Sequence, residues 1–129
     1  MNGSIADIRT RVRETIATAT GEEVYQDIVP EGSEAGYLVE LKNIGLDAQT
    51  IDGGQAMIPC EVDVMCYSYN TRQESDELAD KIIGLLNNKG STFFRRIRLT
   101  GITSLAYIDG EGVFVDLLSF EFVVKANGV

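Results

Sequence analysis

The chain has 129 residues, of which 44% are hydrophobic and 24% are charged. This composition fits one folded domain with a single core, over residues 1–129, and excludes a disordered chain. The formal net charge of −9 argues against a DNA- or RNA-binding module, because an acidic surface repels phosphates. There is no apolar run long enough to span a bilayer, and the first residues lack the pattern of a signal peptide. We therefore expect synthesis in the cytoplasm.

The first predicted element is an amphipathic helix over about residues 4–18. Its apolar positions recur at helical spacing, and they are Ile5, Ile8, Val12 and Ile16. Its polar side carries Arg9, Arg11, Arg13 and Glu14. Ser4 is the candidate N-cap. A short strand over 23–28, a loop and a second strand over 37–44 are predicted to follow.

Residues 45–55 form a long polar connection between two predicted strands. Asp52, Gly53 and Gly54 are typical of a turn, so the connection is predicted to be an extended hairpin arm. Connections of this length in compact domains are usually functional or mobile. A partner-contacting arm and an ordinary surface loop are both compatible with the pattern.

The centre of the chain is a predicted strand that leads into a capped helix. Residues 61–69 alternate, with Val62, Val64 and Cys66 on one face, as expected for a half-buried strand. Thr71 and Glu74 have the spacing of a capping box. The helix that follows has an apolar stripe made of Leu78, Ile82, Leu85 and Leu86. Its polar side, with Asp76, Glu77 and Asp80, is interpreted as a solvated face.

The last third is predicted to consist of strands over 93–100, 102–108 and 113–124, with a hairpin turn at 109–112. In the final strand, Phe120, Phe122 and Val124 share one face. The order of helix, strands, helix and strands predicts an α+β fold. Its elements are a mainly antiparallel β-sheet with two α-helices packed on one face, and a long β-hairpin arm. The other sheet face is left for something else to cover.

The residues needed for common catalytic sites are missing. There is no histidine, which removes Ser-His and Cys-His nucleophilic sites and His-ligated zinc. Cys60 and Cys66 fall on one strand, roughly 20 Å apart at the usual rise per residue, which is too far for a disulfide. We therefore expect two reduced thiols, with Cys66 buried.

The sequence predicts no metal, cofactor or catalytic site. Asp109, Glu111 and Asp116 lack the spacing of a calcium loop. The glycines of the arm lack the lysine and the strand-to-helix context of a phosphate loop.

A basic cluster stands out in this acidic chain. It consists of Arg95, Arg96 and Arg98, and strand alternation places Arg96 and Arg98 on one face. One interpretation is an edge strand protected by charge. The other is a partner surface, in which a basic patch of one copy meets an acidic patch of the next and closes a ring.

Short pieces in a fixed order carry a family resemblance over about residues 4–125. These pieces are Val24-Tyr25, Val29-Pro30, Tyr37-Leu-Val-Glu40, Val62-Asp-Val-Met-Cys-Tyr-Ser68, Glu77-Leu-Ala-Asp80, Leu85-Leu86, Tyr107 with Asp109-Gly-Glu-Gly112, and Phe120-Glu-Phe122. Together with the first helix, they resemble the tail-terminator and tail-completion (tail-to-head joining) proteins of phages with long non-contractile tails.

The resemblance implies a structural virion protein and not an enzyme. Such proteins look like small α+β domains that form a hexameric ring on the last ring of the tail tube. The ring stops tube polymerisation and joins the tail to the head connector, and DNA passes through it without specific binding. The implied partners are further copies of the chain, the tail-tube protein and the head-tail connector or neck protein, with no membrane and no cofactor. The implied location is the virion tail or neck, with the host cytoplasm during assembly.

The choice of interface residues does not come from a family motif. Arg95, Arg96, Arg98 and the arm residues Asp52, Gly53 and Gly54 are chosen from charge and position. Three alternatives stay open. They are a neck or head-closure protein of the connector, a small-molecule-binding α+β regulatory domain, and an enzyme that works without histidine. A small-molecule-binding domain predicts a pocket between the helices and the sheet.

Overall fold

The computed structural model describes residues 5–22, 24–26, 29, 31–45, 50–52, 55–87, 94–107 and 112–126. The two helices are α1 (Ile5–Thr20) and α2 (Arg72–Leu86). The strands are β1 (Val24–Gln26), β2 (Ala35–Ile44), β3 (Thr50–Asp52), β4 (Gln55–Ser68), β5 (Phe94–Tyr107) and β6 (Val113–Ala126).

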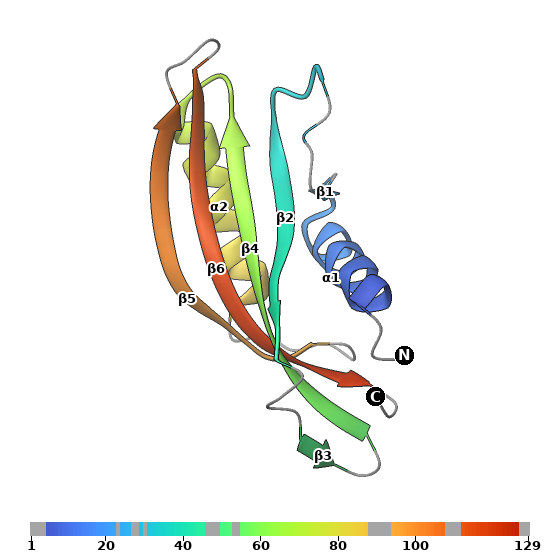
Figure 1. The fold of residues 1–129 in the computed structure, drawn as a ribbon. Coiled ribbons are helices and arrows are strands. Elements are labelled where there is room, and N and C mark those ends of the chain that lie inside the picture. Colours follow the sequence, from blue (N-terminus) through green and yellow to red (C-terminus); the bar gives the residue numbers. More distant parts are fainter. Residues whose placement is uncertain are drawn as a thin grey trace.

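The strands form one sheet in the order β1-β2-β4-β6-β5, and β3 pairs with the start of β4. Only the β1–β2 pairing is parallel among the described strands. Both helices lie on the same face of the sheet, with α1 near the β1–β2 side and α2 behind β4 and β6 (Figure 1). The predicted α+β fold, with two helices on one face of a mainly antiparallel sheet, is confirmed.

The core lies between this face and the helices. Alternate residues of β4 and β6 point into it, as predicted from their period of two. They include Val62, Val64, Cys66, Leu118, Phe120, Phe122 and Val124, each at most 3% exposed. The helices contribute Ile8, Val12, Ile16, Ala79, Ile82 and Leu86. Ile5 and Leu85, which the helical spacing placed on the apolar stripes, are instead 57% and 38% exposed.

The N-terminus of α2 is capped differently from the prediction. Thr71 Oγ1 accepts from the backbone N–H of Glu74 at 3.1 Å, as a capping box requires. The reciprocal contact is replaced, because the Thr71 N–H donates to Ser68 Oγ at 3.2 Å. The Glu74 carboxylate accepts from Ser68 Oγ at 2.6 Å and from Asn70 Nδ2 at 3.1 Å. The cap therefore ties the helix to the end of β4.

Two strands are longer than the sequence predicted. β4 begins at Gln55 rather than at residue 61. β5 is a single strand where two were predicted. The register with β6 shifts between Leu99 and Gly101, but the two strands stay paired on both sides of this shift.

The predicted arm is present as a hairpin of β3 and the first residues of β4. Asp52 pairs with Gln55, while Gly53 and Gly54 lie outside the described residues. At its base, Gly45 donates its N–H to the Pro59 carbonyl at 2.7 Å. A Cβ at position 45 would lie 2.9 Å from Pro59 Cγ, so this close approach favours glycine.

Candidate interaction surfaces

No described element covers the sheet face opposite the helices, which we call the open face. At the end nearer the start of α2, its side chains are apolar. Leu38, Met65 and Leu117 lie opposite one another on β2, β4 and β6, and all three are half-buried. These side chains are half-buried although no described element packs on them.

The middle of the open face carries an acidic band. Glu40 pairs directly with Asp63, and Glu61 pairs directly with Glu121. Like charges directly opposite each other destabilise a sheet. Two neighbouring contacts moderate the repulsion, because Ser119 Oγ donates to Asp63 Oδ1 at 2.9 Å and the Arg98 guanidinium forms an ion pair with Glu121.

Two hollows are lined by residues of β2, β4, β5, β6 and the arm base. The larger, of about 410 Å³, is lined by Asn43, Gly45, Pro59, Cys60, Glu61, Glu121, Phe122 and Val123. The smaller, of about 260 Å³, is lined by Lys42, Glu61, Asp63, Thr100, Gly101, Ser119 and Phe120. Neither is lined by a helix residue, so neither is the pocket between helices and sheet that a small-molecule-binding domain predicts.

The predicted basic cluster lies on β5, which is an edge strand of the sheet. Ile97 is buried between Arg96 and Arg98, and the pairing with β6 shifts between Arg95 and Arg98. The prediction that Arg96 and Arg98 share a face assumed unbroken alternation, which this shift interrupts. Arg98 itself is exposed and forms its ion pair with Glu121 within the chain.

The structure brings the predicted arm and basic cluster to the same end of the sheet. β5 begins at Phe94, which pairs with Val124, and the arm-bearing start of β4 pairs with the next residues of β6. Asp52 is the last residue of β3. Two strands, β4 and β6, therefore lie between the two groups of candidate contacts.

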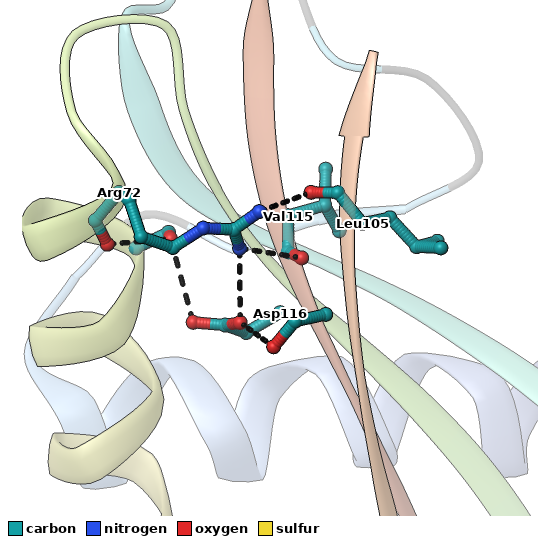
Figure 2. A network of polar contacts seen from close by, with 6 residues as sticks. Arg72, Leu105, Val115 and Asp116 are labelled. Carbon is teal, nitrogen blue, oxygen red and sulfur yellow. Dashed lines mark hydrogen bonds and ion pairs between the residues drawn. The ribbon is translucent and has the colours of Figure 1, made fainter.

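A polar network joins the start of α2 to the β5 edge (Figure 2). Arg72 donates to the Leu105 carbonyl at 2.6 Å and to the Val115 carbonyl at 3.1 Å, and it pairs with Asp116 at 3.1 Å. Asp116 also accepts from Ser104 Oγ at 2.7 Å and from Ser75 Oγ at 3.3 Å. One arginine thus links the helix to both β5 and β6.

The charges in this network control the pKa of Asp116. Burial opposes its ionisation, but the hydrogen bonds from Asp76 and Ser104 and the positive charge of Arg72 outweigh burial and lower its pKa. The same hydrogen bond raises the pKa of Asp76, which lies exposed on α2. Asp116 is therefore ionised at neutral pH.

Sequence reasoning missed this network, although a signal was available. Asp116 occupies a core-facing position, in step with Leu118 and Phe120 along the final strand. A carboxylate at such a position needs a partner, because burying an unpaired charge is costly. Its grouping with the turn residues Asp109 and Glu111, which lie outside the described residues, hid that signal.

The two cysteines are free and buried, as expected for Cys66. Burial raises the pKa of the Cys60 thiol to about 12 and raises that of Cys66 still further. Both thiols are therefore neutral near pH 7 and poor nucleophiles. Among the described residues there is no group of His, Cys, Asp and Glu that could hold a metal. Neither α1 nor α2 is long and apolar enough to cross a membrane.

The comparisons with known proteins give likenesses in structure and none in sequence. No protein-family model matches this sequence, and no curated protein matches it either. Among solved structures, the chain is similar to a chain of the structure described as the virion of a native gene transfer agent particle. The TM-score is 0.55 and the sequence identity is 17%, over 92% of each chain. At this identity the likeness shows a shared fold.

Proposed function

We propose that this protein is a structural subunit of a phage-like virion. The observation that carries the proposal is the likeness in fold to a chain of a gene transfer agent virion, because it extends over 92% of both chains. The proposal agrees with the resemblance to tail-terminator proteins that the sequence pattern gives.

We further propose that the subunits form a ring, expected to be hexameric, at the head-proximal end of the tail. There the ring would stop tail-tube polymerisation and join the tail to the head connector. The acidic band on the open face supports this role. Glu40, Asp63, Glu61 and Glu121 keep like charges opposite one another at a cost in stability, and a negative surface repels DNA that passes close to it.

The protein is proposed to work without catalysis or a cofactor. The sequence offers no histidine, and the buried thiols are held in their neutral form. The arm, with Asp52, Gly53 and Gly54, and the basic residues Arg95, Arg96 and Arg98 remain proposed contacts to neighbouring copies or to the tube.

Two measurements test the proposal. Particles from cells that express an epitope-tagged chain should carry immunogold label at the junction of head and tail. Cells that lack the gene should release separate heads and tails whose tubes vary in length. Absence of the label from purified particles would contradict a virion role.

The alternative, a neck or head-closure protein, makes a different prediction for the same gene deletion. Tails would then keep a uniform length, and filled heads would lose their DNA because they are not closed. Tube length in negative-stain images therefore separates the terminator from the head-closure protein.

A further inference from the structure

The two outer flanks of the helical layer carry opposite charges. α1 contacts β1 and β2, whereas α2 contacts β2, β4, β6 and β5, and the two helices also contact each other. One outer flank is therefore the side of α1 at the β1 edge, and the other is the side of α2 at the β5 edge (Figure 1). We call them the α1 flank and the α2 flank.

One side of α1 carries an exposed apolar residue and two half-buried arginines at regular spacing. Ile5, Arg9 and Arg13 are spaced four residues apart and so follow one side of the helix. Ile5 is 57% exposed although it belongs to the apolar periodicity of α1. Neither Arg9 nor Arg13 forms an ion pair or hydrogen bond with another residue that the structure describes.

The α2 flank presents the complementary set. Asp76 and Asp80 are exposed and one helical turn apart. Asp76 lies on the β5 side of α2, because Arg72, one helical turn before it, donates to the Leu105 carbonyl of β5. On β5, Ile102 pairs with the buried Leu118, which places Ile102 on the helix-covered side of the sheet, and yet Ile102 is 56% exposed.

We infer that the α1 flank of one copy binds the α2 flank of the next, with Arg9 and Arg13 facing Asp76 and Asp80 around a contact between Ile5 and Ile102. The inference rests on the proposed ring and names the surfaces that close it. Because the two surfaces differ and lie at opposite edges of one layer, the contact is head-to-tail and repeats from copy to copy. Two of the four exposed large hydrophobic residues of the described chain lie in it.

The geometry of the layer agrees with this arrangement. Within one copy, α1 and α2 already lie side by side on the sheet. A copy added at either flank continues the alternation of α1 and α2. It also brings the free edge of β5 towards the β1 edge of its neighbour. The helical layer and the sheet can therefore extend together from one copy to the next.

Reciprocal charge reversal in the full chain tests the inference. One variant carries Arg9→Glu with Arg13→Glu, and the other carries Asp76→Lys with Asp80→Lys. Sedimentation velocity and native mass spectrometry at about 50 mM and 500 mM salt should show a wild-type oligomer that weakens as salt rises. Each variant alone should bind itself at least about tenfold more weakly. An equimolar mixture should regain the oligomer, because each α1–α2 contact between unlike variants again joins opposite charges.

Controls on the same helices keep the test specific. Arg11 is two residues from Arg9 and from Arg13 and therefore points to another side of α1, and Lys81 of α2 pairs with Glu22 next to the end of α1. Arg11→Glu and Lys81→Ala should therefore both associate like the wild type. Circular dichroism checks that each variant is folded. Recovery of the oligomer in the equimolar mixture would show independently that both variants are folded.

Three outcomes overturn the inference: a wild-type chain that stays monomeric at low salt, variants that associate as the wild type does, or a mixture that fails to recover. None of these results bears on whether the tagged chain is found at the head-tail junction, so the proposed function stands or falls separately.

Discussion

The two faces of this sheet are built from the same strands but differ in how deeply their side chains are buried and in how many of them are charged. On the helix-covered face, Leu118 and Phe120 are at most 1% exposed and belong to one continuous core. On the open face, Met65 and Leu117 are only half-buried, and carboxylates stand opposite carboxylates. The comparison indicates that one face stabilises the fold while the other is free of any described element, and that the surfaces proposed above for association are not part of the core.

The largest expected difference between the faces comes from removing an apolar side chain. Phe120→Ala should lower the free energy of unfolding by about 3–5 kcal/mol, because it leaves a cavity in a core that is closed by both helices. Its matched control on the same strand is Leu117→Ala, expected to cost about 1 kcal/mol, since a half-buried site relaxes into solvent. Urea denaturation followed by circular dichroism measures both. Equal losses would show that the open face is as well packed as the core.

The Arg72–Asp116 network predicts a smaller effect with a defined pH dependence. Asp116→Asn should cost about 2–3 kcal/mol at pH 7, because it removes a charge from a largely buried ion pair and weakens two serine contacts. The pKa of Asp116 is lower in the folded protein, so its stabilisation is present above about pH 4 and is lost as the pH falls further.

Urea midpoints measured between pH 7 and pH 2.5 check this prediction. The urea midpoint of the wild type should fall as the pH drops below about 4. The midpoint of Asp116→Asn should fall less over the same pH range. Asp80→Asn on the exposed side of α2 is the control, and its midpoint should follow that of the wild type. A variant that loses as much stability in acid as the wild type would show that Asp116 does not carry the effect.

The difference between the two faces also decides what the sequence could predict. Alternation along β4 and β6 identified the core face because burial follows a period of two. The cap at Thr71 was predicted from spacing, since its contacts are local. Asp116 was not placed with Arg72, because the two residues are 44 positions apart and only the pairing of distant strands brings them together.

The candidate contacts show the same limit. One of the two interpretations of the basic cluster placed Arg98 on an edge strand, and the sheet order does place β5 at an edge. The sequence could not show that Glu121 faces Arg98, since that depends on a shift in register between β5 and β6. It also placed Ile5 in a buried stripe. Helical spacing defines a side of a helix, whereas burial depends on how far the neighbouring elements extend.

The smallest expected effect on stability lies on the open face. Arg98→Ala removes an ion pair whose two side chains are 65% and 41% exposed, and it should change the free energy of unfolding by less than about 1 kcal/mol, because exposed ion pairs contribute little. Lys42→Ala, on the neighbouring part of the same face, should cause an equally small change in the free energy of unfolding, measured by urea denaturation.

Measuring association then separates the two interpretations of Arg98. If Arg98→Ala keeps its stability and still forms the wild-type oligomer, the residue serves to offset the repulsion between Glu61 and Glu121. If it keeps its stability and loses the oligomer, β5 contributes its open-face charge to the contact between copies.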